Sequence, residues 1–134
     1  MEQLLEFIPQ NAIEQKLAEE YAGECSNDEL VMALRNRIIF VGSSTLTTPD
    51  GDNFTPLLLK ADGALMVACF TSRVRLGLYP AYADGAFETP WYRFIVGLPP
   101  GHGVVLNPGY THQKLISAAE VSKLKVWLGF PDLA

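Results

Sequence analysis

The side chains of this chain that could do acid–base or metal chemistry are few and far apart. The only histidines are His102 and His112, and the only cysteines are Cys25 and Cys69. Zinc sites gather their ligands in close pairs such as Cys-x₂-Cys, and reactive cysteines favour electropositive, partly open positions. The two cysteines stand far apart, and Cys69 lies inside the apolar run ALMVACF, where a thiol packs as a small hydrophobe. We therefore predict no metal site, no catalytic residue and no cofactor.

The stretch GHGVVLNPGY (101–110) gathers glycines around a histidine, an asparagine and a proline. A phosphate-binding loop needs its glycines after a strand and before a helix. Here the first glycines precede the apolar run, so the pattern favours a strand that ends in a turn. Pro108 and Gly109 suit the centre of a type II turn, where glycine supplies a positive φ. Asn107, before the proline, is expected to be extended and to hydrogen-bond the turn backbone.

The elements that must position these residues begin with helices. Three helix starts carry a capping box, in which a Ser or Asn side chain accepts from a backbone N–H and a glutamate reaches back. They are Asn11 with Glu14, Ser26 with Glu29, and Ser117 with Glu120. Ile13, Leu17 and Tyr21 recur every fourth residue and should form one apolar helix face. A fourth helix is predicted to begin at Thr89, with Pro90 in its first turn.

Four apolar runs, rich in residues that pack on a pleated surface, predict strands at 37–43, 56–60, 64–71 and 103–107. The first three follow one another too closely for helical crossovers, and an Asp-Gly connection marks a hairpin, so antiparallel pairing is expected. The order of elements indicates an α+β fold in a single domain spanning 1–134. A mainly antiparallel or mixed sheet of about four or more strands should pack with about four helices.

Two motifs carry a resemblance to a known family. GVVLNPG ends a strand before a Ser-x-x-Glu helix start, and CFTS (69–72) lies upstream. In this order the motifs resemble the N-terminal domain of the SseB family, named for enhanced serine sensitivity in bacteria, from about Asn11 to Leu128. The resemblance implies a bacterial cytoplasmic α+β domain with no agreed catalytic residues. We interpret the motif residues as structural: Thr71, Ser72, Asn107, Pro108 and Gly109.

Composition limits the classes of partner. The formal net charge is −5 and the basic residues are scattered, which argues against a nucleic-acid or anionic-membrane surface. The N-terminal stretch MEQLLEFIPQ fits neither a signal peptide nor a membrane span, and free thiols suit a reducing compartment, so a cytoplasmic location is expected. The apolar stretch 4–8 should cover a sheet edge or contact a second copy.

The segment 76–90 departs from the family pattern and, with its neighbours, is rich in aromatic residues. The candidate binding residues are Arg73, Tyr79, Tyr82, Trp91 and Tyr92, because Tyr and Trp are enriched at interfaces. Whether 76–90 forms core or interface is open at this point. The main hypothesis is a non-catalytic binding or regulatory module that acts through protein–protein contact. The alternative is a small enzyme or metabolite-binding domain with a site near 71–92 and 107–112. An exposed apolar patch favours the first, and a concave pocket with convergent polar groups favours the second.

Overall fold

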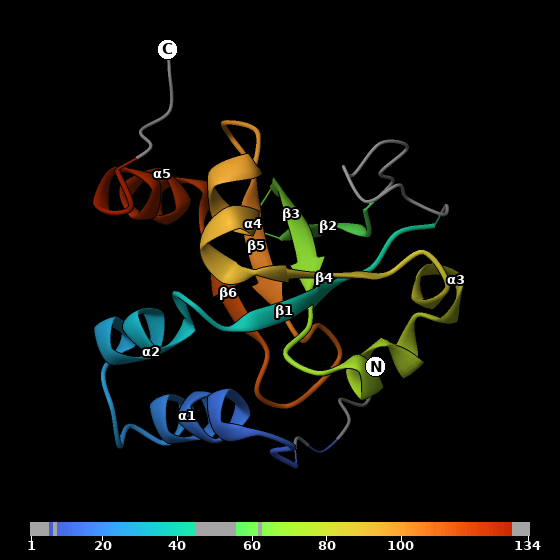
Figure 1. Ribbon diagram of the computed structural model, residues 1–134, viewed down its shortest axis with the longest axis horizontal. Helices are drawn as coiled ribbons and strands as arrows, with labels where there is room; N and C mark the ends of the chain where they lie inside the picture. The colour runs from blue at the N-terminus through green and yellow to red at the C-terminus, as the bar shows by residue number, and fades with distance from the viewer. Residues whose placement is uncertain (1–5, 7, 45–55, 62, 130–134) are drawn as a thin grey trace.

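The computed structural model describes residues 6, 8–44, 56–61 and 63–129 (Figure 1). Six helical segments and six strands occur within these residues, so the expected α+β fold is confirmed. They are α1 (Ala12–Tyr21), α2 (Asn27–Leu34), β1 (Ile38–Val41), β2 (Leu58–Ala61), β3 (Ala64–Cys69), the 3₁₀ helix η1 (Arg73–Leu78), α3 (Pro80–Ala83), β4 (Phe87–Pro90), α4 (Trp91–Gly97), β5 (Gly103–Leu106), β6 (Lys114–Ile116) and α5 (Ala118–Trp127).

The strands form two sheets. The larger has the order β2-β3-β5-β6, in which β3 and β5 run parallel and the outer pairs are antiparallel. The expected hairpin of β2 and β3 is confirmed. The expected antiparallel contacts of 37–43 with the other two strand segments occur only as isolated bridges, Phe40–Phe70 and Ser43–Pro56, because β1 pairs along its length with β4 instead. The sequence FETP of β4, with its proline and few β-branched residues, gives little strand signal.

The fourth helix begins two residues later than predicted. Thr89 and Pro90 belong to β4, where Thr89 pairs with Ile39, and α4 begins at Trp91 with Pro90 as its N-cap. The Trp91 N–H donates to the carbonyl oxygen of Arg37 at 2.9 Å. Strand pairing with the β1 segment therefore continues to the first residue of the helix and delays its start.

The three predicted capping residues all cap their helices. The side chains of Asn11, Ser26 and Ser117 accept hydrogen bonds from the N–H groups of Glu14, Glu29 and Glu120. Each such cap contributes about 1 kcal/mol to helix stability. Tyr21 departs from the predicted apolar face. It is the last residue of α1 and is 61% exposed, and its ring lies against that of His112, tilted by 39° with 4.2 Å between the centroids.

The larger core lies between the helices and the sheets. Figure 1 shows α4 in front of β5, with α5 to one side, α2 beside the start of β1 and α1 below α2. Trp91, Phe94 and Ile95 of α4 are buried in this core with Val104 and Leu106 of β5 and with residues of α1, α2 and α5. A smaller cluster, which includes Met66, Phe70 and Val105, lies on the other face of the larger sheet. Segment 76–90 packs largely on that cluster, through Leu76, Tyr79, Tyr82 and Ala86.

The apolar stretch 4–8 lies almost wholly outside the described residues. Only Glu6 and Ile8 of it are described, and Ile8 is 59% exposed. Its role at a sheet edge or against a second copy stays a prediction.

Candidate interaction surface

The two family motifs meet at the ends of the parallel strands β3 and β5. Thr71 follows β3 and Asn107 follows β5, and both are buried. The Asn107 Oδ1 accepts from the Thr71 N–H at 3.1 Å, and the Asn107 Nδ2 donates to the Thr71 Oγ1 at 2.9 Å. The Thr71 Oγ1 donates in turn to the Glu14 carboxylate at 2.5 Å. The Asn107 amide is thus linked through the Thr71 hydroxyl to Glu14 in the first helix, α1.

An ion pair between Glu14 and Arg75 completes this buried network. Both residues are buried, and the Arg75 Nη2 donates to the Glu14 Oε1 at 2.7 Å and the Nε to the Oε2 at 3.2 Å. The guanidinium also lies 4.9 Å from the ring centroid of Tyr110. Burial alone would raise the pKa of Glu14, but hydrogen bonds from Arg75, Thr71 and the Gln10 N–H together outweigh it. The pKa of Glu14 is therefore below its ordinary value of 4.5.

Asn107 differs in conformation from the prediction. Its φ is +52°, in the left-handed region, whereas an extended residue was expected before Pro108. Asparagine tolerates this region better than most residues, and here the conformation accompanies an amide bonded to Thr71 rather than to the turn. Gly109 has the predicted positive φ, +88°, and the Tyr110 N–H closes the turn on the Asn107 carbonyl at 3.3 Å.

The network lies at the place where the alternative hypothesis puts a site, near 71–92 and 107–112. Its polar groups are directed at one another: the carboxylate of Glu14 accepts from Arg75, Thr71 and the Gln10 N–H. Buried charges held this way join α1 to the ends of β3 and β5 instead of facing a cavity. The geometry is that of a structural network.

The five predicted binding residues do not come together on one surface. Trp91 is 1% exposed, which argues against any direct contact with a partner. Tyr79 and Tyr82 are half-buried against the smaller core cluster. Arg73 is exposed, with its guanidinium 5.6 Å from the ring centroid of Phe40. Tyr92 is half-buried beside α2 and α5, and it alone of the five borders the surface described next.

Apolar and aromatic side chains are exposed where α2, α4 and α5 meet. We call Met32, Arg35, Tyr92 and Trp127 the α2–α5 surface. Met32 is 66% exposed and Trp127 48% exposed. The Arg35 guanidinium lies 5.4 Å from the Trp127 ring centroid, and the Tyr92 N–H donates to the Arg35 carbonyl at 3.2 Å. A hollow of about 250 Å³ beside them is lined by Arg35, Asn36, Tyr92 and Leu128.

Sequence reasoning missed most of this surface. The sequence signal that could have indicated it is a large apolar residue outside the buried face of its helix. Met32 stands between the buried residues Val31 and Leu34, and Trp127 follows Lys125, which is buried on the core side of α5. Successive residues are about 100° apart around a helix axis, so the side chains of Met32 and Trp127 point away from the core.

The comparison with known families decides the relationship. The chain matches the SseB protein N-terminal domain over residues 13–123. This protein belongs to that family. No curated protein and no solved structure matches it. None of the helices in the described part of this SseB domain is long and apolar enough to cross a membrane.

The matched range separates the two features described above. The side chains of the buried network, from Glu14 to Asn107, all lie within 13–123. The α2–α5 surface lies partly outside that range, because Trp127 comes after its end. Any role of this surface is therefore argued for this chain, from its own geometry.

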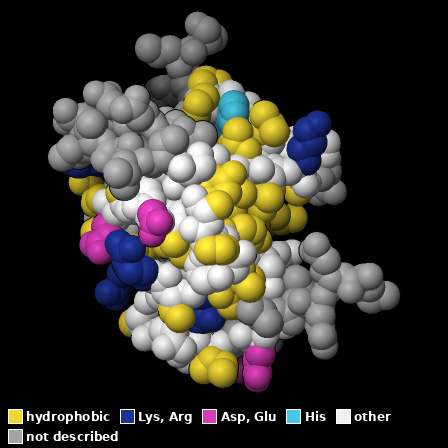
Figure 2. Space-filling model, turned by 90° about the vertical axis from the view of Figure 1, so that its right-hand side faces the viewer, with side chains coloured by type: hydrophobic (Ala, Val, Ile, Leu, Met, Phe, Trp, Pro, Cys, Tyr) yellow, Lys and Arg dark blue, Asp and Glu magenta, His cyan; other side chains and the backbone are white. Residues whose placement is uncertain are grey.

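A groove in this SseB domain provides the concave site that the alternative hypothesis requires. It has a volume of about 740 Å³ and lies between β4 and α4 on one side and β2 and β3 on the other. Figure 2, which faces the side of the molecule that carries β2 and α3, shows hydrophobic side chains in a band below a histidine. The lining includes Leu58 and Phe87, with Glu88, Arg93 and His102 as its charged or titratable members. Because Glu88 and Arg93 carry opposite charges, charge selects no single ligand class.

Neither cysteine lines the groove or the hollow, whereas His102 lines the groove. Cys69 is fully buried in the core, and burial raises the pKa of its thiol well above the ordinary value. Cys25 is half-buried, with its Sγ donating to the Lys16 carbonyl at 3.7 Å. Among the residues that the structure describes, no three His, Cys, Asp or Glu side chains gather in a way that could hold a metal ion.

Proposed function

We propose that this SseB domain is a non-catalytic binding or regulatory module of the bacterial cytoplasm, which holds a partner protein on the α2–α5 surface. The observation that carries the proposal is the pair of Arg35 and Trp127. An indole that is 48% exposed is held by a guanidinium at the edge of a hollow.

The residue types of the surface support a protein partner. Tyr, Trp, Met and Arg are the residues enriched at protein interfaces, and Trp, Tyr and Arg dominate binding hot spots. A cation–π contact at an exposed site contributes about 0.5 to 1 kcal/mol, which restrains Trp127 before any partner arrives. Less side-chain freedom is then lost on binding. Met32, with its flexible thioether side chain, adapts to the partner's shape.

The size of the hollow supports the same partner class. Small-molecule sites usually enclose about 300–1,000 Å³, and the hollow beside Trp127 is smaller, at about 250 Å³. A space of this size accommodates one large side chain. Insertion of a partner's anchor residue next to an exposed indole is the usual arrangement of an interface hot spot.

The alternative, a small enzyme or metabolite-binding domain, draws its support from the 740 Å³ groove, whose volume suits a small ligand. The groove overlaps the predicted 71–92 segment only from Phe87 onward. At 107–112 and at Thr71 and Arg75, the polar side chains serve the buried network instead. We therefore rank the alternative second.

The test compares three baits in bacterial lysate: the wild type, Trp127→Ser and the matched control Val126→Ser. Val126 is 63% exposed on the same helix but points about 100° away from Trp127. Captured proteins are cross-linked to the bait and the cross-linked bait residues are mapped. We expect a partner cross-linked near α2 and α5 of the wild type and of Val126→Ser, and its loss in Trp127→Ser at unchanged melting temperature.

Two results would contradict the proposal. One is a partner that Trp127→Ser retains as well as the wild type does. The other is no protein partner together with a small molecule that co-purifies with the wild type and is lost when Phe87→Ser opens the groove. The second result would favour the metabolite-binding alternative.

A further inference from the structure

We infer that the partner of the α2–α5 surface is an acidic protein segment, in which carboxylates flank one apolar side chain that enters the hollow beside Trp127. This inference rests on the proposed function and adds the chemistry of the partner.

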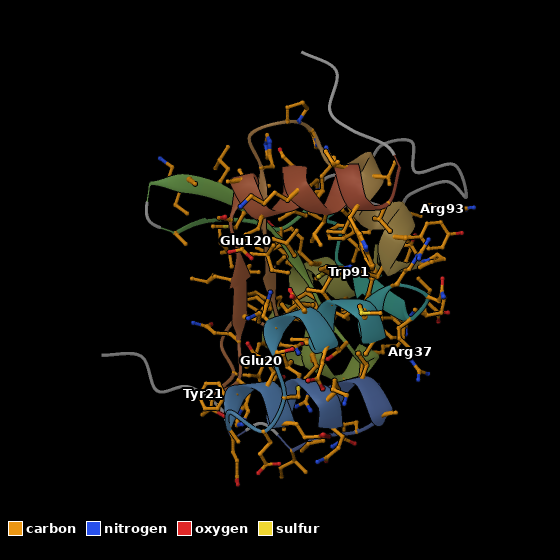
Figure 3. The ribbon with its side chains drawn as sticks, turned by 90° about the vertical axis from the view of Figure 1, so that its left-hand side faces the viewer. Glu20, Tyr21, Arg37, Trp91, Arg93 and Glu120 are labelled. Carbon is orange, nitrogen blue, oxygen red and sulfur yellow. The ribbon has the colours of Figure 1, made fainter. Side chains whose placement is uncertain are left out.

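Three arginines lie at the surface or next to it in the chain. Arg35 lines the hollow, the exposed Arg37 follows two residues later, and the exposed Arg93, which also lines the 740 Å³ groove, follows Tyr92. Backbone hydrogen bonds hold the two segments together, since the N–H groups of Trp91 and Tyr92 donate to the carbonyls of Arg37 and Arg35. Figure 3 shows Arg37 and Arg93 at the same margin of the molecule, with Trp91 inside it.

These guanidinium groups are available to a partner. Within the described part of the chain, no carboxylate lies within salt-bridge distance of Arg35, Arg37 or Arg93. By contrast, the buried Arg75 binds Glu14 through two nitrogens. A guanidinium presents a planar fork that binds a carboxylate through two parallel hydrogen bonds. Arg35 at the hollow, with Arg37 and Arg93 on the two adjoining segments, gives this surface a preference for carboxylates.

The residues that line the hollow also favour a negatively charged partner, and they add a need for an apolar side chain. Its four residues are Arg35, Asn36, Tyr92 and Leu128, none of which is acidic. Tyr92 and Leu128 supply apolar contact for an inserted side chain, while Asn36 and Arg35 supply polar groups at its edge. An apolar anchor with acidic neighbours matches both properties at once.

A protein segment fits better than a polyanion. The whole chain carries 15 acidic against 10 basic residues, a net charge of −5, so its overall field repels nucleic acid and anionic membranes. Three arginines are few for a phosphate backbone, whose binding depends on many simultaneous contacts. A short acidic segment needs only the local patch.

The experiment uses random peptides displayed on phage and selected on the full chain. We expect enrichment of Asp and Glu on both sides of Leu, Phe or Trp. An enriched peptide is then synthesised and its affinity measured for the wild type, for Trp127→Ser and for the double variant Arg35→Met with Arg37→Met. Each variant should bind about tenfold more weakly or worse, as loss of a hot spot does. Arg73→Met is the matched control, since Arg73 is exposed over Phe40 instead, and it should bind as the wild type does.

The outcomes separate this inference from the proposed function. Neutral or basic peptides that depend on Trp127 would overturn the acidic partner and leave the proposed function standing. Acidic peptides that bind the double arginine variant as tightly as the wild type would also overturn the acidic partner and leave the proposed function standing. An absence of enriched peptides, or peptides indifferent to Trp127, would overturn both. Displacement of the peptide by single-stranded DNA or by phosphatidylglycerol vesicles at lower concentrations than by glutamate-rich peptide would assign the surface to another class of anion.

Discussion

Asn107 and Thr71, which are far apart in the sequence, are joined through both ends of one side-chain amide. The Asn107 Oδ1 accepts from the Thr71 N–H at 3.1 Å, and its Nδ2 donates to the Thr71 Oγ1 at 2.9 Å. Both residues follow strands that pair in parallel, so the amide fastens the two strand ends where ladder pairing stops. Because the Thr71 hydroxyl also donates to Glu14, the same contact holds α1 against the sheet.

We predict that Asn107→Ala lowers the free energy of unfolding by about 3 kcal/mol. The change leaves the buried N–H of Thr71 without its acceptor and places alanine at φ +52°. Asn107→Gly loses the same amide but accepts the positive φ, and it should cost about 1 kcal/mol less than alanine. Denaturant unfolding of both variants measures the difference. An alanine variant as stable as the wild type would show that the amide contributes nothing.

The ion pair of Glu14 and Arg75 should make stability depend on pH. The folded-state pKa of Glu14 is lowered from 4.5, so the unfolded chain binds the proton first as the pH falls. The contribution of Glu14 is therefore fully present above the unfolded pKa and is lost as the pH falls through the folded pKa. Glu14→Gln should remove this acid dependence. At neutral pH it should cost about 3 kcal/mol, because Arg75 stays buried without its carboxylate.

The control for that experiment is Glu19→Gln, which breaks the partly exposed pair with Lys16 at the surface of α1. Exposed pairs contribute at most about 1 kcal/mol, so this variant should keep the acid dependence of the wild type. The measurement is the unfolding free energy of both variants and the wild type from neutral pH to below the ordinary carboxyl pKa. A Glu14→Gln variant with the same pH profile as the wild type would contradict the assignment.

The sequence predicted local structure where one residue decides it. The caps at Asn11, Ser26 and Ser117 and the positive φ of Gly109 each follow from a side chain or its absence. The family relationship was also predictable, because the motifs around Thr71 and Asn107 are recognisable in order.

Prediction from the sequence failed where contacts between residues far apart in the chain determine the structure. The conformation of Asn107 depends on its bonds to Thr71, which no local rule before a proline contains. The strand β4 exists because β1 offers it a partner, although its own sequence is a weak strand former. The pairing of Arg35 with Trp127 joins the ends of two helices that are remote in sequence, so aromatic density along the chain pointed to 76–92 instead.

Two glycines without positive φ should respond differently to alanine. A Cβ at Gly103 would lie 2.6 Å from the carbonyl oxygen of Ile116, in the paired strand β6, which cannot move aside cheaply. Gly103→Ala should therefore cost about 1 to 3 kcal/mol. At Gly97 a Cβ would meet nothing within 4 Å, and Gly97→Ala should be neutral or stabilise by up to about 1 kcal/mol. Equal thermal melts of the two variants would refute the close approach of β5 and β6.

The last prediction concerns the two thiols. Cys69 is fully buried and its thiol pKa is raised well above the ordinary value, so it should resist alkylation in the folded protein. Cys25 is half-buried, and its pKa is raised first by desolvation, so it should react slowly at neutral pH and faster as the pH rises. Mass spectrometry after a timed treatment with iodoacetamide should show Cys25 modified well before Cys69, and both modified in denaturant. Rapid native labelling of Cys69 would mean that the core around β3 opens, and it would reinstate this thiol as a candidate nucleophile for the enzyme alternative.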